Sequence, residues 1–161
     1  MTETKDVAAR KQAGDVLQLV SFSVGHEEFG VDILKVQEIN RMVEITRVPN
    51  APDCVSGVIN LRGKVIPVVD LRQRFALEKR EDDKDTRIIV VELSNRVLGF
   101  VVDAVNAVLR IPRNVTEPPP PMVAGIGSEY ITAIAKLEDR LLILLDLERV
   151  LTAEEGAQIA A

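Results

Sequence analysis

The sequence predicts an all-β fold with short helices, organised as two pseudo-repeated five-stranded β-barrels that share one hydrophobic core. The first observation is an internal repeat, because residues 57–75 (GVINLRGKVIPVVDLRQRF) match residues 133–151 (AIAKLEDRLLILLDLERVL) at an offset of 76 (146 − 70). Such self-similarity indicates a duplicated structural unit. The second is composition, since 47% of the residues are apolar and only 3% are aromatic. A core built largely from Val, Ile and Leu favours strands.

The segment that precedes each copy repeats as well, at an offset of 69 (99 − 30). The difference of seven residues (76 − 69) predicts a longer connection in the second copy, where residues 118–121 are four prolines. A stiff loop is favoured for these prolines over a polyproline ligand segment. The matched pairs of the earlier segment are Val20/Ile89, Phe22/Val91, Val24/Leu93, Phe29/Leu98, Gly30/Gly99, Val36/Val105, Ile39/Val108 and Arg41/Arg110.

The first copy follows a polar tail. Residues 1–15 are charged and without periodicity, so they are expected to be disordered. At residues 20–24 apolar side chains alternate with serines, which is the period of a half-buried strand. The turn at residues 25–28 leads back into residues 29–31 and predicts a hairpin. Residues 33–39 predict one helical turn followed by another strand.

A second hairpin is predicted by the apolar runs at residues 58–61 and 64–69. Its turn lies at residues 62–63, where a glycine accommodates the positive φ that a tight turn requires. Asp70 and the matching Asp146 each follow a strand. Each is expected to cap a short helix by accepting hydrogen bonds from backbone N–H groups.

The mixed-charge run at residues 78–87 predicts a solvated linker between the copies. One domain is therefore expected over residues 16–151, made of two intertwined barrels at about 16–80 and 86–151. A barrel of about sixty residues is marginal alone, so the two are expected to share a core. Residues 152–161 are expected to extend the last helix and then fray.

Composition excludes several classes of function. The net charge is −5 and the pI is near 5.0, and no local basic patch is visible, so nucleic-acid binding is not expected. The apolar runs are shorter than the roughly 20 residues that span a bilayer, so a cytoplasmic protein without membrane insertion is expected. Cys54 and His26 are the single cysteine and the single histidine, which excludes an intrachain disulfide and a Cys-rich zinc site. We expect no metal and no cofactor, and interpret Cys54 as a small buried residue and His26 as a turn residue.

One set of motifs resembles a known family. Residues 57–63 (GVINLRG), followed by residues 65–72 (VIPVVDLR) and Phe75, resemble the signature of the chemotaxis coupling proteins, the CheW family. The resemblance covers about residues 16–151. It implies two SH3-like barrels and a non-catalytic adaptor that joins the tips of chemoreceptors to the histidine kinase CheA, recruited to membrane receptor arrays. Agreement extends to residues 29–31 (FGV), 36–39 (VQEI) and 49–52 (PNAP).

The resemblance also implies a receptor site in the groove between the barrels. An apolar face of a receptor hairpin would press on valines, while an arginine at a turn apex would reach a carboxylate or a helix C-terminus. The alternative interpretation is that these valines are core residues, the glycines relieve crowding, and the arginine is a solvated turn residue. The implied receptor-binding residues are Val36, Glu38, Gly57, Arg62, Gly99 and Val105.

For the kinase, the resemblance implies docking on the regulatory domain of CheA, which is a relative of the same fold. The contact is expected at edge strands of the first barrel, through Phe29, Val31, Ile33 and Leu34. A second contact is implied in the long loop of the second barrel. There Met122 stands where the family pattern leads one to expect an aromatic residue, and methionine can also fill an apolar pocket.

Other functions predict different features. An enzyme would use Asp70, Asp103 or Asp146 with Arg62 or Arg110, but no nucleophile or metal ligand set accompanies these residues. A nucleic-acid-binding barrel needs a basic, aromatic face, which the acidic balance disfavours. A CheW-like regulatory module of a non-motility two-component pathway is the nearest alternative. The length leaves no room for a fused receiver or kinase domain, so a stand-alone coupling protein is expected.

Overall fold

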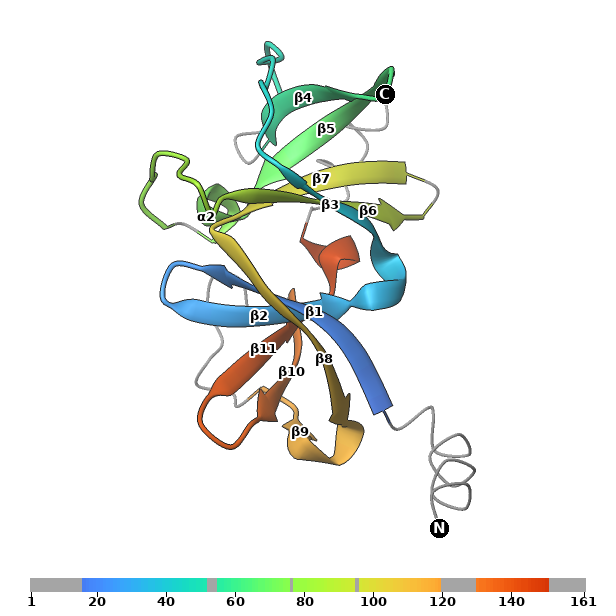
Figure 1. Ribbon diagram of the computed structural model, residues 1–161, viewed down its shortest axis with the longest axis vertical. Coiled ribbons are helices and arrows are strands. Elements are labelled where there is room, and N and C mark those ends of the chain that lie inside the picture. Colours follow the sequence, from blue (N-terminus) through green and yellow to red (C-terminus); the bar gives the residue numbers. More distant parts are fainter. Residues whose placement is uncertain (1–15, 52–54, 76, 95, 120–129, 151–161) are drawn as a thin grey trace.

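The computed structural model describes residues 16–51, 55–75, 77–94, 96–119 and 130–150 (Figure 1). Within these residues the chain is built almost entirely from strands, which confirms the predicted all-β class with short helices. The predictions for the terminal segments 1–15 and 152–161, for Cys54 and for Met122 fall outside the described residues.

The first sequence copy forms five strands in the predicted order. The single helical turn after the first hairpin is a 3-10 turn, and the residues after the second hairpin form a short α-helix. These elements are β1 (Val16–Val24), β2 (Glu27–Asp32), η2 (Ile33–Lys35), β3 (Val36–Arg41), β4 (Val55–Leu61), β5 (Lys64–Asp70) and α2 (Leu71–Arg74).

The second copy repeats this order. Its predicted longer connection contains an additional 3-10 turn and a two-residue strand. The elements are β6 (Arg87–Leu93), β7 (Arg96–Val102), β8 (Ala104–Pro112), η3 (Arg113–Val115), β9 (Thr116–Glu117), β10 (Ile131–Lys136), β11 (Leu141–Leu145) and η6 (Leu147–Arg149).

The strands form two sheets, which lie one above the other in Figure 1 with the orange-red η6 between them. One sheet has the order β8-β1-β2-β11-β10-β9 and the other has the order β3-β6-β7-β5-β4. Each sheet therefore combines the first hairpin of one copy with the later strands of the other copy. The expected boundaries at 16–80 and 86–151 follow the sequence repeat and differ from this division, because the chain crosses between the sheets at η2 and again between β7 and β8.

The duplication is visible in the strand register. Phe22 pairs with Phe29 in the first hairpin, and the repeat-equivalent Val91 pairs with Leu98. Bulges recur too, since the β1–β8 and β3–β6 pairs shift at equivalent places and the β4–β5 and β10–β11 pairs do the same. Both sheets also contain one parallel pair, β5 with β7 and β11 with β2. The repeat thus specifies pairing geometry as well as hydrophobicity.

Both sheets curl toward closure. In the second sheet, Thr46 bridges to Val58, which brings the segment after β3 onto β4. In the first sheet, β9 follows β8 and pairs with β10. The two barrels then share one large hydrophobic cluster to which both sheets contribute, including Phe22 and Phe29 from one and Val91 and Phe100 from the other. This cluster is the shared core that the sequence predicts.

The two predicted caps are present. Asp70 accepts a hydrogen bond from the Arg72 backbone N–H at 2.9 Å and precedes α2. Asp146 accepts from the Glu148 backbone N–H at 3.0 Å and precedes η6. A carboxylate in this position satisfies a donor that the first helical turn leaves unpaired.

Candidate functional site

Glu38 and Arg62 are brought together although 24 residues separate them in the chain. Glu38 comes from β3, which is the edge strand of its sheet, and Arg62 comes from the β4–β5 turn. Arg62 Nη2 donates to Glu38 Oε2, and the arginine side chain is 73% exposed. Asn40 Nδ2 donates to the other carboxylate oxygen at 2.7 Å. The result is an oriented, accessible ion pair at a sheet edge.

The turn that carries Arg62 is tightly defined. Arg62 and Gly63 have φ values of 52° and 83°, so both central residues occupy the left-handed region that a two-residue hairpin turn uses. The prediction covered only the glycine. The Gly63 backbone N–H also donates to Asn60 Oδ1 at 3.0 Å, and this hydrogen bond joins the turn to the end of β4. Arg62 is therefore presented at the apex in a constrained backbone.

Val36 and Val105 occupy equivalent positions on the two edge strands β3 and β8, each opposite a core residue of the neighbouring strand. Both are half-buried and pack against the shared core. Ile39 and Val108 follow on the same strands and are exposed by 38% and 60%. Sequence reasoning paired these two residues through the repeat but did not select them as surface residues. They are apolar side chains at exposed positions of the two edge strands.

Gly57 and Gly99 are buried, so neither offers a side-chain surface to a partner. Gly57 has a φ of 151°, and a Cβ there would lie 2.1 Å from the carbonyl oxygen of Thr46. A Cβ at Gly99 would lie 2.9 Å from Ile88 Cγ2. Their placement matches the alternative interpretation, in which the absent side chain allows close packing.

The residues expected to contact the kinase divide into two groups. Phe29 and Val31 are only 7% and 2% exposed and belong to the shared core. Their strand β2 lies between β1 and β11, so the expectation of an edge strand here was wrong. Ile33 and Leu34 lie on η2 and line a cavity of about 430 Å³, and Leu34 is 89% exposed. Only the second group is accessible.

The cavity beside η2 is lined by both apolar and polar residues. It lies beside β2, whose parallel pairing with β11 covers only Phe29 and Gly30. Leu34 is therefore an exposed apolar side chain beside a cavity, which makes it a candidate anchor for a protein contact. Its remaining walls include Leu17, Leu19, Asp32, Arg113, Ala133 and Leu144.

The carboxylates that an enzyme would need are engaged elsewhere. Asp70 and Asp146 cap helical turns, and Asp103 is paired with Arg72. Arg62 pairs with Glu38, whereas Arg110 lies on β8 opposite Gln18. Among the described residues there is no group of three or more His, Cys, Asp or Glu side chains placed to hold a metal ion. None of the helices described is long and apolar enough to cross a membrane.

Comparison with known proteins identifies the family of this chain. The family model of the CheW-like domain matches residues 18–155. The chemotaxis protein CheW of Klebsiella aerogenes is 41% identical over 151 residues, which cover 92% of this chain and 91% of that protein. The CheW of Helicobacter pylori is 36% identical, with 85% and 82% covered. The crystal structure of the scaffolding protein TtCheW from Thermoanaerobacter tengcongensis superposes with a TM-score of 0.79 at 42% identity, covering 86% of this chain and 94% of that one. The chain belongs to the CheW family.

Proposed function

We propose that this protein is a non-catalytic adaptor of bacterial chemotaxis, which couples the cytoplasmic tips of chemoreceptors to the histidine kinase CheA at receptor arrays. The observation that carries the proposal is the accessible Glu38–Arg62 pair at the edge strand β3, the strand that also carries the half-buried Val36. Membership of the CheW family supports it. The partners are two proteins, and the protein itself acts from the cytoplasm.

The receptor surface is proposed at the two edge strands, β3 and β8. Val36 and Val105 supply equivalent apolar positions, Ile39 and Val108 extend them, and Arg62 supplies a charge. An amphipathic helical hairpin binds such a surface through apolar contacts at helical spacing and a polar contact at one end. Gly57 and Gly99 contribute by allowing strands of the second sheet to pack closely.

The kinase surface is proposed at η2, where Ile33 and Leu34 border the cavity of about 430 Å³. Leu34 is 89% exposed, so a partner that covers it would remove a large apolar side chain from water, which makes it the candidate anchor of the contact. Phe29 and Val31 contribute by holding β2 in the core. A contribution from Met122 stays a prediction.

The receptor contact is tested by Arg62→Asp. Binding of a receptor cytoplasmic fragment should weaken by about tenfold or more, as expected for a charged interface anchor. The melting temperature should change little, because an exposed ion pair contributes at most about 1 kcal/mol. Isothermal titration and thermal unfolding measure the two quantities. The matched control is Glu138→Lys, which reverses the charge at the repeat-equivalent turn position (138 − 62 = 76). Unchanged receptor affinity in Arg62→Asp would remove this surface from the proposal.

The kinase contact is tested by Leu34→Asp. Affinity for the isolated CheA regulatory domain should fall by about tenfold or more, since a charge would be desolvated at the centre of the contact. Receptor affinity should stay the same. Val65→Asp is the matched control, because Val65 is another aliphatic residue that is 70% exposed. Equal losses in both variants would point to a general effect of an added charge and contradict the assignment.

A further inference from the structure

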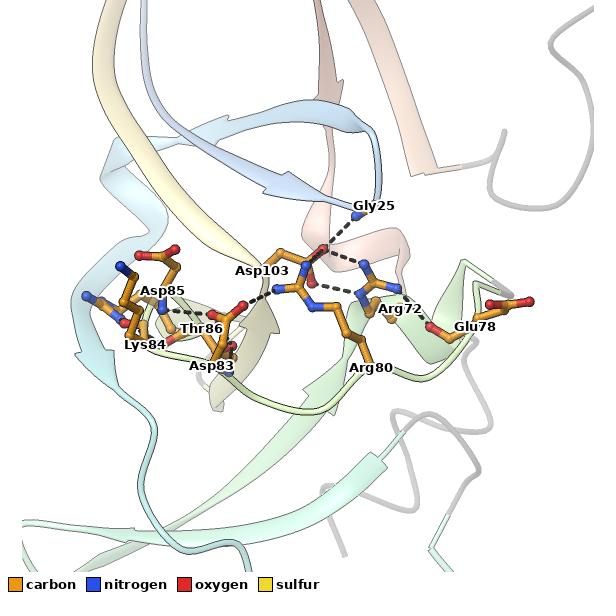
Figure 2. A network of polar contacts seen from close by, with 10 residues as sticks. Gly25, Arg72, Glu78, Arg80, Asp83, Lys84, Asp85, Thr86 and Asp103 are labelled. Atoms are coloured by element: carbon orange, nitrogen blue, oxygen red, sulfur yellow. Dashed lines mark hydrogen bonds and ion pairs between the residues drawn. The ribbon is translucent and has the colours of Figure 1, made fainter.

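A single carboxylate, that of Asp103, lies where the chain crosses from one sheet to the other and contacts elements of both barrels. Asp103 is the one residue between β7 of one sheet and β8 of the other. Its backbone N–H donates to the Ser23 carbonyl at 2.9 Å, and its Oδ2 accepts from the Gly25 N–H at 2.8 Å. Figure 2 shows the contact between Gly25 and the carboxylate, with the β1–β2 turn above Asp103. The crossover is thereby fixed to the hairpin of the opposite sequence copy.

The same carboxylate binds the helix that follows β5. Arg72 Nε and Nη2 donate to the two oxygens of Asp103 at 2.8 and 2.7 Å, which is the two-bond geometry that arginine forms with carboxylates. Arg72 Nη1 donates to the Glu78 carbonyl at 2.8 Å. Arg80 lies 3.6 Å from Asp103 and 3.2 Å from Asp83 (Figure 2). The side chains of Asp103 and Arg72 are only 11% and 17% exposed.

The repeat provides an internal comparison for this cluster. The repeat-equivalent junction has Ser94 at the position of Gly25, Leu34 at the position of Asp103 and Glu148 at the position of Arg72 (offsets of 69, 69 and 76). There Ser94 Oγ donates to Glu148 Oε1 at 2.7 Å. At this second junction the β6–β7 turn therefore contacts η6 without an aspartate–arginine pair. The fold alone does not require the pair.

The position of the pair links the two proposed surfaces. Asp103 stands two residues before Val105 on β8, and the hairpin that it holds leads through β2 to Ile33 and Leu34. The residues around the pair also line a cavity of about 750 Å³, among them Gly25, Arg72, Leu77 and Arg80. The hairpin tip therefore lies between this cavity and the Asp103 carboxylate.

We infer that Asp103 and Arg72 are positioning residues for signal coupling, which hold the β7–β8 crossover, the β1–β2 hairpin and α2 in one arrangement so that occupation of one surface alters binding at the other. This inference rests on the proposed function. Neither residue is placed in either contact surface. Their effect is on the free-energy coupling between two binding events, which is reciprocal by thermodynamic linkage.

The experiment measures the dissociation constant of a receptor fragment with and without saturating CheA regulatory domain. The ratio of the two constants reports the coupling and typically departs from one by about fivefold or more in a coupled protein. Asp103→Asn keeps the shape of the side chain and removes its charge. It should bring the ratio close to one while each partner alone binds within about twofold of the wild type, the resolution of such a measurement.

Three further variants make the result specific. Arg72→Gln should have the same effect as Asp103→Asn, and the double variant should be no worse, because both single changes break one contact. Arg72→Lys keeps the charge without the two-bond geometry, remains testable if Arg72→Gln unfolds, and should give an intermediate ratio. Ser94→Ala, at the repeat-equivalent junction, should keep the wild-type ratio.

The outcomes separate this inference from the proposed function. If the wild type binds both partners with a ratio of one, or if Asp103→Asn keeps the wild-type ratio, the inference is overturned and the adaptor proposal stands. If the wild type binds neither partner, the adaptor proposal fails first. Hydrogen exchange supplies a readout that needs no partner, since the amide at Gly25 should exchange faster in Asp103→Ala than in Ser94→Ala.

Discussion

At Gly57 the backbone of β4 passes directly beneath the carbonyl of Thr46, the residue that closes the second sheet. The φ of 151° and the 2.1 Å that would separate a Cβ from that oxygen each oppose a side chain. Two backbone hydrogen bonds of 2.8 Å join Thr46 and Val58 and hold the segments at this distance. Glycine is required here by contact as well as by conformation.

We predict that Gly57→Ala lowers the free energy of unfolding by on the order of 3 kcal/mol or more, because the new methyl group must displace a hydrogen-bonded segment. Urea unfolding followed by circular dichroism measures the change. Gly63→Ala is the control for conformation alone. Its φ is 83° but a Cβ there meets no atom within 4 Å, so a cost of about 1 kcal/mol is expected. Equal costs in the two variants would contradict the contact argument.

Local chemistry at the residue scale is readable from sequence. The caps at Asp70 and Asp146 and the positive φ at Gly63 all depend on neighbours within three residues, and all are present. The burial of Gly57 depends on Thr46, and that of Gly99 on Ile88, contacts that only the folded chain brings about. The same holds for the Glu38–Arg62 pair, since residues 24 apart meet only when β3 and the β4–β5 turn are placed.

At the scale of elements, the repeat predicts strands but not their partners. Hairpins and turns follow from alternation and glycine placement, so they were predicted correctly. Whether the β1–β2 hairpin packs on its own copy or on the other cannot be derived from those patterns, because both arrangements satisfy the same local signals. In the structure the first hairpin of each copy packs on the later strands of the other copy, which we call the exchange of hairpins. The placement of β2 inside its sheet, rather than at an edge, follows from this exchange.

The exchange predicts that the two sequence copies do not fold separately. A peptide of residues 16–80 contains β1 and β2 without β8 and β11, and contains β3 to β5 without β6 and β7. Most ladder bonds and the shared core are then missing. Circular dichroism should show little strand in this peptide or in residues 86–150 alone. Mixing the two should restore the strand signal.

A peptide of similar length that contains one complete sheet serves as the comparison for residues 16–80. Residues 36–102 contain every strand of the second sheet in one continuous segment, so they should retain more strand signal per residue than residues 16–80 at the same length scale. A stable, monomeric fold for residues 16–80 alone would show that a copy can close on itself and would contradict the exchange as a requirement for stability.

At the scale of the whole molecule, the apolar core holds the barrels together and charged clusters at its margins fix their arrangement. The core cluster includes residues from both sheets and from η6, so burial alone joins the halves without specifying an orientation in detail. The Asp103–Arg72 pair is directional, and it has no counterpart of the same chemistry at the repeat-equivalent junction. Divergence between two copies of one unit has therefore changed charges while keeping the strand register.

The charged cluster predicts how stability depends on pH. Burial would raise the pKa of Asp103, but hydrogen bonds from Arg72 and Gly25, with the charges of Arg72 and Arg80, outweigh it and lower the pKa below its usual value. The folded protein therefore binds a proton at this site less readily than the unfolded chain, in which aspartates have a pKa of about 3.9. The stability from this group is present above that pH and is lost as the pH falls through the lower, folded pKa.

We predict that Asp103→Asn lowers the free energy of unfolding by about 2 kcal/mol at pH 7, the contribution of a hydrogen bond to a charged group, and that the difference from wild type shrinks as the pH falls below the usual aspartate pKa of about 3.9. Urea unfolding at a series of pH values measures it. Glu28→Gln is a second test, on the β1–β2 hairpin, because the hydrogen bond and the charge of Arg140 help to lower the pKa of Glu28 against its burial, so the same narrowing is expected. If the difference in free energy of unfolding between wild type and Asp103→Asn stays constant or grows as the pH falls, the cluster does not stabilise the ionised form of Asp103, and the prediction is wrong.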